Sequence, residues 1–545
     1  MADDVKIDIR IAVTSLSGNR AASLCLPLSA TVRLLKIRLA RTCSSPPYAQ
    51  RLMWETRILL DHETFVTIGL PDGVELSLVC LPCSENAGRA LLDNARSGDV
   101  IALRQSLHAP ANPDYARTSD GLTPLSVASY HGHASAVGLL CEAGANMDLC
   151  MKNGATPLHL AAQSACLDVV RCLSKANASL DCSANDGRAP LHVACQKDHL
   201  EVVQYLCVAR ADVNKMGPHC MTPLFFACQL GHARVLSLLC QSLADVHLAD
   251  LGGTTPLHAA IQEGHVSIVW YLCKSNAQIQ TRGRGGRTAL HVAGFCGHVG
   301  IAHWLVSIGA ATEVEDAQKM TPLHLASQQG HVVVARALIQ LKADLEAKAL
   351  DDLRPLHTAC LNDQDDVVRL LLDAGAALDA CSNCGVTSTY LAASRGLIDI
   401  VMLLCAADAD LDRTEIDGAS PLSVAACHGF RDVVECLCDH GASCDLQDHR
   451  GASPLYIAAQ NGHSTVVDFL CIAKADLNRT NYNRVSPLYI ATQKGHTSVV
   501  RGLCEHAAEL HKPTKHGLTP LVVAEHNAHL DIVRCIRDAM VSVKK

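Results

Sequence analysis

The sequence predicts a mainly α-helical solenoid of about 14 repeats, each about 33 residues long, preceded by a small α+β domain. Three observations carry this prediction. From position 123 onward one pattern recurs at a constant interval, at 123, 156, 189 and beyond, without an insertion. Within each repeat, apolar residues recur at helical spacing on two short segments. Positions 1–84 lack this period, and their apolar residues alternate as in β-strands.

The repeat is clearest in residues 255–277, TPLHAAIQEGHVSIVWYLCKSNA. Thr255 is predicted to cap a helix with its hydroxyl, and Pro256 suits the first helical position, where a missing N–H costs nothing. Gly264 is expected to end this helix in the left-handed region before a second apolar stripe begins. Two short helices bury only one face each, so the pair needs neighbours to offset the entropy of ordering its backbone.

Those neighbours follow at a fixed distance. Two places after the first position stands Leu in twelve of thirteen repeats, with Thr389 as the exception, and five places after it stands Ala in all thirteen. The first position falls at residues 123, 156, 189, 222, 255, 288, 321, 354, 387, 420, 453, 486 and 519. This period together with T-P-L-H-x-A is typical of ankyrin repeats, and the chain resembles that family over roughly its last 460 residues.

The two ends of the array differ from its interior. Residues 85–122 carry Leu91, Leu92 and Ala95 but lack the Thr-Pro start, so they are predicted to be a degenerate N-capping repeat. Residues 123–518 then form twelve repeats, and residues 519–545 form a more polar C-capping repeat, as the exposed end of a solenoid requires.

Residues 1–84 are predicted to form a separate domain. Residues 5–11 and 23–26 alternate like two strands of a hairpin, and Thr31 could cap a helix with an apolar face of Val32, Leu35 and Leu39. Two more apolar segments follow at residues 51–54 and 74–79. The segments PPYAQRLMW, LSG and VELSLVCL resemble the PP-x-x-QRL segment, first turn and last strand of ubiquitin, which implies a ubiquitin-like β-grasp fold.

The resemblance implies a docking surface in this domain. Ubiquitin's recognition patch falls on Leu16, Met53 and Val79, and an exposed apolar trio is a plausible contact for a receptor. The alternative is that these three side chains only close the core of the domain. Pro82, Cys83 and Ser84 stand where a conjugation tail would end in Gly-Gly, so the domain should not be a conjugating tag.

Composition and charge narrow the function. A net charge of −8 argues against a general nucleic-acid partner. No run of eighteen apolar residues and no basic-then-apolar start occurs, so neither membrane insertion nor secretion is expected. A cytoplasmic or nuclear monomer follows as the expectation.

The abundant cysteines and histidines are interpreted as structural. Eight cysteines stand eighteen places after the first position and are predicted to be core residues: Cys141, Cys207, Cys240, Cys273, Cys405, Cys438, Cys471 and Cys504. Cys381 and Cys384 form a CxxC without a second pair at zinc spacing. Six histidines occupy the fourth motif position and seven follow Gly, a repetition that favours hydrogen bonds to nearby backbone. We therefore expect no metal, no cofactor and no catalytic residue.

The candidate binding residues stand at surface positions whose residue type varies from repeat to repeat, while the structural positions of the repeat stay the same. In ankyrin stacks the fingertips and the ends of the first helices line a groove that binds proteins. The places seven and eight after the first position put polar and aromatic candidates there: Tyr130, His131, Gln229, Gln262, Phe295 and Gln328. A basic fingertip adds Arg282, Arg284 and Arg287, with an acidic patch near Asp351 two repeats later; the alternative is an ordinary solvated surface. Residues 350–395, where Arg354 and Thr389 break the motif, are predicted to be the softest part of the array.

These features predict a non-enzymatic scaffold or adaptor. The repeat groove would bind a client protein, and the ubiquitin-like domain would dock to a receptor of the ubiquitin pathway. The alternative is a plain ankyrin scaffold whose N-terminal domain is only structural.

Overall fold

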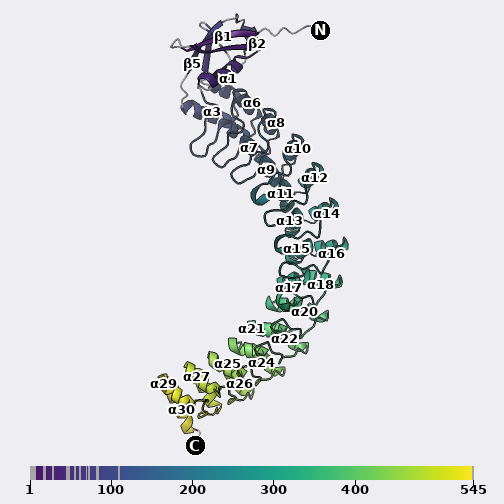
Figure 1. The fold of residues 1–545 in the computed structure, drawn as a ribbon, viewed down its shortest axis with the longest axis vertical. Helices are drawn as coiled ribbons and strands as arrows, with labels where there is room; N and C mark the ends of the chain where they lie inside the picture. The colour runs from purple at the N-terminus through teal and green to yellow at the C-terminus, as the bar shows by residue number, and fades with distance from the viewer. Residues whose placement is uncertain are drawn as a thin grey trace. The chain divides into compact units, whose positions relative to one another are not determined.

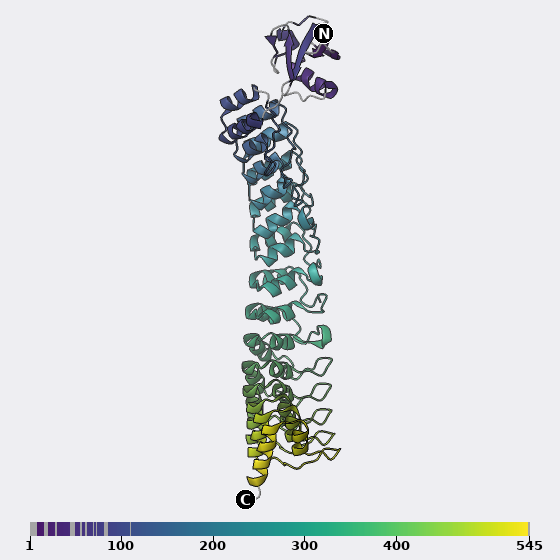
Figure 2. The ribbon, with the colours of Figure 1, turned by 90° about the vertical axis from the view of Figure 1, so that its left-hand side faces the viewer.

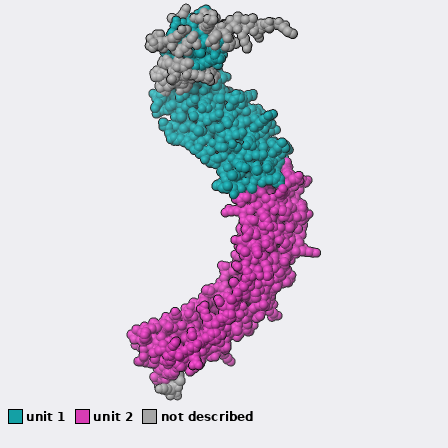
Figure 3. All heavy atoms as spheres, viewed as in Figure 1, with its two compact units in different colours: residues 1–251 teal, residues 252–545 magenta. Residues whose placement is uncertain are grey.

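The computed structural model describes residues 8–15, 20–27, 30–43, 50–54, 57–59, 63–68, 70–71, 74–80, 85–108 and 111–542. The chain divides into two compact units, residues 1–251 and residues 252–545 (Figure 3). Compact unit 1 contains a small sheet domain and the first repeats. Compact unit 2 contains the remaining repeats.

The N-terminal domain is a mixed five-stranded sheet with one long helix. Its elements are β1 (Asp8–Ser15), β2 (Arg20–Pro27), α1 (Val32–Cys43), β3 (Gln50–Trp54), β4 (Arg57–Ile58), α2 (Phe65–Ile68) and β5 (Val74–Cys80). The strand order is β2-β1-β5-β3-β4. The central pair β1 and β5 is parallel, and the other strand pairs are antiparallel.

The core of this domain lies between α1 and the sheet. Val32, Leu35 and Leu39, the predicted helix face, are fully buried, and Ile11 and Leu76 join the same cluster. The predicted helix and the segments at 51–54 and 74–79 are therefore confirmed. The first strand extends beyond its predicted end, and residues 5–7 and 16–19, which include the expected turn, fall outside the described residues.

Compact unit 1 continues with paired helices (Figure 1). They are α3 (Glu85–Ser97), α4 (Val100–His108), α5 (Pro124–Tyr130), α6 (Ala134–Glu142), α7 (Pro157–Gln163), α8 (Leu167–Lys175), α9 (Pro190–Gln196), α10 (Leu200–Val208), η2 (Pro218–Cys220), α11 (Pro223–Leu230) and α12 (Ala233–Gln241). Leu91, Leu92 and Ala95 are buried in α3, which packs against α5 as a first repeat helix would.

Compact unit 2 repeats the same pairing. Its helices are α13 (Pro256–Gln262), α14 (Val266–Lys274), η3 (Arg284–Gly286), α15 (Ala289–Cys296), α16 (Val299–Ser307), α17 (Pro322–Gln329), α18 (Val332–Gln340), η4 (Leu350–Asp352), α19 (Pro355–Leu361), α20 (Asp365–Asp373), α21 (Ser388–Arg395), α22 (Ile398–Ala406), α23 (Pro421–His428), α24 (Arg431–Asp439), α25 (Pro454–Asn461), α26 (Ser464–Ile472), α27 (Pro487–Lys494), α28 (Thr497–Glu505), α29 (Pro520–His526) and α30 (Leu530–Ser542).

The helix boundaries follow the predicted cap chemistry. The Thr222 and Ser453 hydroxyl oxygens accept the backbone N–H three residues later, at 3.2 and 3.3 Å, and a proline opens each helix. Gly297 ends α15 with a φ of 81°. A Cβ at Gly297 would lie 2.7 Å from the His331 ring, so both the conformation and the close approach require glycine.

Within each unit, neighbouring repeats are joined at both helix rows and at the loops. First helices pack on first helices, as in α15 with α17, and second helices on second helices, as in α16 with α18. The loops between repeats project to one side (Figure 2). Loop tips donate a backbone hydrogen bond to the tip of the preceding loop, for example from Ala317 N to Gly285 O at 2.8 Å and from Asn383 N to Asp351 O at 2.9 Å.

The predicted core role of the periodic cysteines needs correction. Cys405 is 7% exposed, but the other seven are only half-buried. They sit next to a fully buried Leu of the second helix, such as Leu437 beside Cys438, and this Leu fills the core position. The cysteine thus occupies the edge of the helix interface, where a thiol is tolerated without being enclosed.

No helix in the described part of the chain combines the length and apolar character needed to cross a membrane.

Candidate functional site

The candidate site consists of exposed and half-buried side chains at the ends of the first helices. In compact unit 1, Tyr130 ends α5 with 48% of its surface exposed, and His131 beside it is also exposed. The two rings meet edge-on at 5.3 Å, and His131 stacks with His133 at 6.0 Å. These contacts hold the aromatic group in place, so it offers a preformed apolar and hydrogen-bonding surface.

The same repeat position continues in both units. Gln229 near the end of α11 is half-buried. In compact unit 2, Gln262 ends α13 and is exposed, whereas Phe295 and Gln328, near the ends of α15 and α17, are half-buried. Since α13 packs on α15 and α15 on α17, the structure brings these last three residues into one row across adjacent helices.

Phe295 makes more contacts within the array than an aromatic residue that is free to bind a partner would make. It packs against the buried cluster of Met320, Leu325 and Ala349. The Arg287 guanidinium lies over its ring, 4.8 Å from the centroid. A cation held over a ring face is attracted by the ring quadrupole, so this contact ties the fingertip to the helix.

The predicted basic fingertip separates into structural and available arginines. The Arg287 Nε atom lies 3.5 Å from a carboxylate oxygen of buried Asp316, and Arg282 donates to the Glu315 carbonyl oxygen at 2.6 Å. Arg284 is exposed in η3 and makes no hydrogen bond or ion pair to the described residues. Of the three arginines, Arg284 is therefore the one that this tip offers to a partner.

Part of the acidic patch is also paired with groups of the array itself. Lys348 Nζ lies 2.7 Å from Asp352, and this hydrogen bond lowers the pKa of the Asp352 carboxyl group. Asp365 and Asp366 occupy the first turn of α20, where negative charge interacts favourably with the helix dipole. Asp351 remains exposed in η4.

The histidines of the T-P-L-H motif are structural. His159 Nδ1 accepts the Thr156 backbone N–H at 3.1 Å, and its Nε2 lies 2.9 Å from the Arg188 carbonyl oxygen of the next repeat. A carbonyl only accepts, so Nε2 carries the proton and the ring is neutral. Burial lowers the pKa of five such histidines, to about 4 in three of them: His192, His324 and His357, with His159 and His291 also lowered.

The histidines that follow Gly form hydrogen bonds to the preceding repeat, whereas the motif histidines form them to the next repeat. The Nε2 atom of each of six lies 2.9–3.3 Å from a carbonyl oxygen in the last turn of the previous repeat's first helix: His133, His232, His298, His331, His463 and His496. The predicted backbone role of both histidine sets is thus confirmed, and it adds a link between repeats.

The N-terminal candidates lie on one face of the sheet where they are described. Leu52 and Leu78 face the core, so their neighbours Met53 and Val79 face the other side of the sheet, and both are half-buried. Val79 pairs with Arg51 and Met53 with Ser77, which puts the two candidates one step apart diagonally. Leu16 lies outside the described residues.

One series of hydrogen bonds between successive repeats was not predicted from the sequence. The position twenty-five places after the first, called here position 25, holds Asp, Asn or Glu in nine repeats. Its side-chain oxygen accepts a backbone N–H from the next repeat, as from Ser179 to Asp148 and from Ser443 to Asp412, both at 2.9 Å. The period of these residues was the available signal.

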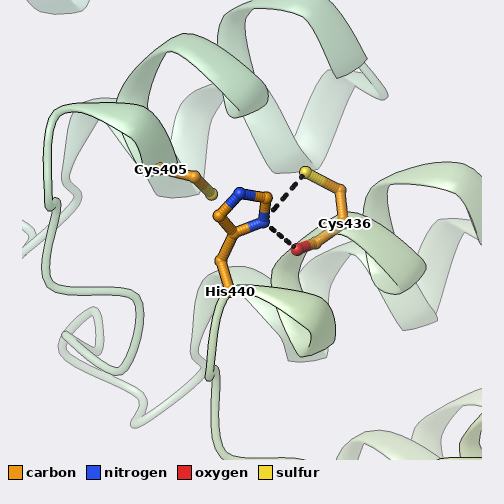
Figure 4. A group of neighbouring side chains, drawn as sticks. All are labelled: Cys405, Cys436 and His440. Atoms are coloured by element: carbon orange, nitrogen blue, oxygen red, sulfur yellow. Dashed lines mark hydrogen bonds between the residues drawn. The ribbon is translucent and has the colours of Figure 1, made fainter.

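A cluster of two cysteines and one histidine, side chains of the types that bind metals, was also not predicted (Figure 4). Cys405, near the end of one second helix, lies close to Cys436 of the next, and His440 follows Cys436 by one helical turn. Their ligand atoms lie within 4.8 Å of one another. Burial raises the pKa of the Cys405 thiol to about 12 and also raises the pKa of Cys436. The available signal was a cysteine in each of two successive second helices, with a histidine one turn after the second cysteine.

Comparison with known proteins identifies the repeats. No curated protein matches the chain. The family model described as ankyrin repeats (3 copies) matches it in ten overlapping segments: residues 91–184, 146–217, 175–250, 215–283, 243–316, 280–349, 306–381, 343–415, 389–481 and 455–544. Since these matches extend from residue 91 to residue 544, the chain belongs to the ankyrin-repeat family.

Proposed function

We propose that this protein is a non-enzymatic adaptor in which the ankyrin array binds a client protein and the N-terminal domain docks to a receptor for ubiquitin-like folds. Ankyrin repeats are generally interaction modules without catalysis, and membership of that family supports the scaffold part of the proposal. Cytoplasm or nucleus is the proposed location, since receptors of the ubiquitin pathway act there.

The client site is supported by a contrast between two groups of residues. One group makes its hydrogen bonds inside the array, and the other is exposed at the ends of the first helices. Hydrogen bonds between neighbouring repeats already engage the motif histidines, the backbone amides of the fingertips and the position-25 side chains. Tyr130, His131 and Gln262 remain exposed at the ends of their helices. A glutamine offers both a donor and an acceptor to a peptide backbone without demanding charge, and a rigid tyrosine adds apolar area.

The docking role of the N-terminal domain rests on topology and on Met53 and Val79. The strand order β2-β1-β5-β3-β4 around a single long helix is the order expected of a ubiquitin-like domain. Met53 and Val79 share the sheet face opposite the core, which supports their availability to a partner over a role in closing the core. The second candidate function is the plain scaffold, in which this face binds nothing.

Capture experiments with full-length variants test both parts. Met53→Ala combined with Val79→Ala should lose ubiquitin-pathway receptors and keep other partners, as read by mass spectrometry. Tyr130→Ala combined with Gln262→Ala should do the reverse. The matched control is Val266→Ala with Val333→Ala, which truncates exposed side chains of second helices. Identical receptor recovery by the wild type and the first pair would leave the plain scaffold as the function.

A further inference from the structure

We propose that Cys405, Cys436 and His440 form a binding site for one zinc ion. Two sulfur ligands and one imidazole select a thiophilic cation and disfavour Mg²⁺ and Ca²⁺, which prefer oxygen. Zn²⁺ accepts this mixed set with tetrahedral geometry and tolerates water in a fourth, open position. The site is independent of the client and receptor roles proposed above.

The spacing of the ligand atoms fits a small closing movement. The two thiols and the imidazole lie within 4.8 Å of one another. Tetrahedral zinc with ordinary bond lengths needs ligand atoms roughly 3.5–3.8 Å apart. Cys405 and Cys436 stand on α22 and α24, which pack directly together, so the remaining roughly 1 Å of approach is asked of side-chain rotation.

The hydrogen bond of His440 prepares the correct nitrogen for the metal. Its Nδ1 atom lies 2.8 Å from the Cys436 carbonyl oxygen and 3.8 Å from the Cys436 Sγ atom. A carbonyl oxygen can only accept, so Nδ1 carries a proton, and Nε2 is the nitrogen left to offer a lone pair to a metal. Metal-ligating histidines generally donate their other N–H to such an oriented acceptor, which fixes the ring. Figure 4 shows the ring lying between the two cysteines.

Burial and charge also suit the ion. Cys405 is 7% exposed and Cys436 is half-buried, while His440 is exposed and leaves a path from solvent. On binding, each thiol releases its proton to solvent and two S–Zn bonds form, with no change in oxidation state. The resulting set of Zn²⁺, two thiolates and a neutral imidazole has no net charge, which limits the cost of its partial burial.

The chain contains natural controls for this site. Cys504 and Cys535 have the same sequence spacing as Cys405 and Cys436, and Ala539 stands where this second pair would need its histidine. Cys141 and Cys172 repeat the arrangement with Ala176 at that position. Only the pair with His440 offers three ligands among these, so the imidazole should distinguish a metal site from a pair of neighbouring thiols.

Titration of the reduced full chain with Co²⁺, followed by competition with Zn²⁺, tests the proposal. The wild type should show the thiolate charge-transfer and tetrahedral ligand-field bands of cobalt, which Zn²⁺ abolishes, with release of about two protons per ion. His440→Ala and Cys405→Ser should each weaken binding by more than the ~10–100-fold that loss of an outer-shell partner costs. Cys504→Ser, the matched control, should bind like the wild type.

A gain of binding keeps the test independent of folding defects. Ala539→His supplies the missing imidazole beside Cys504 and Cys535, so it should raise the stoichiometry by one ion. Wild-type binding in His440→Ala, or equal losses in Cys405→Ser and Cys504→Ser, would overturn the site. Cu⁺ shares the preference for sulfur, and binding of Cu⁺ without binding of Co²⁺ or Zn²⁺ would overturn its assignment to zinc.

Discussion

Lowering the pH from 7 to 5 should destabilise the array through its buried motif histidines. His324 is fully buried, and its Nε2 lies 3.0 Å from the Leu353 carbonyl oxygen of the next repeat. Burial lowers its pKa from 6.5 to about 4. Between pH 6.5 and pH 4, His324 is protonated in the unfolded chain but stays neutral in the folded chain. Stability is therefore present above pH 6.5 and declines as the pH falls toward 4.

The size of this effect follows from the two pKa values. One histidine with a pKa of 6.5 in the unfolded chain and about 4 in the fold contributes about 2 kcal/mol less at pH 5 than at pH 7. His192 and His357 have the same low pKa, so they contribute losses of the same sign.

Urea titrations followed by circular dichroism at pH 7 and pH 5 would measure this loss. His324→Gln should be less stable than the wild type at pH 7 by about 1–3 kcal/mol, because it leaves buried partners unpaired. Its further loss on going to pH 5 should be smaller than that of the wild type by about 2 kcal/mol. His303→Gln, at an exposed position of α16, is the control and should behave as the wild type. Equal pH losses in the wild type and His324→Gln would refute the reasoning.

Three further predictions concern the frame. Ala189→Thr should raise the unfolding free energy by about 1 kcal/mol in denaturant titrations, because Ala189 stands at an N-cap where other repeats carry a hydroxyl that bonds the motif histidine; no gain would contradict the cap assignment. Arg287→Ala should lower stability by about 1–3 kcal/mol in thermal unfolding, since buried Asp316 loses its cation, whereas exposed Arg284→Ala should change nothing. Residues 350–395 should exchange amide hydrogens faster than residues 255–340, because Arg354 lacks the cap hydroxyl; equal rates would show that its ion pair with Glu346, 2.8 Å long, compensates.

The sequence by itself determined the helical frame and its period. Thr or Ser followed by Pro determines where most first helices begin, and a glycine such as Gly297 often determines where they end, because these effects act within a few residues. The structural role of the motif histidines could also be predicted, since a feature that recurs from repeat to repeat serves the repeat. Apolar residues at helical spacing likewise located α1, and two short apolar segments located β3 and β5 in the N-terminal domain.

The tertiary structure alone decided which side chains are available and which come together. Phe295 and Arg287 are both attractive binding residues in the sequence, yet they contact each other, and Arg287 also pairs with buried Asp316, so both side chains serve the fold of the repeats. Cys405 and His440 belong to different repeats, and they meet because second helices of successive repeats stack side by side. Such contacts depend on the packing of one repeat against the next, so a pattern within one repeat does not show them, and only a comparison of positions between successive repeats could have suggested them.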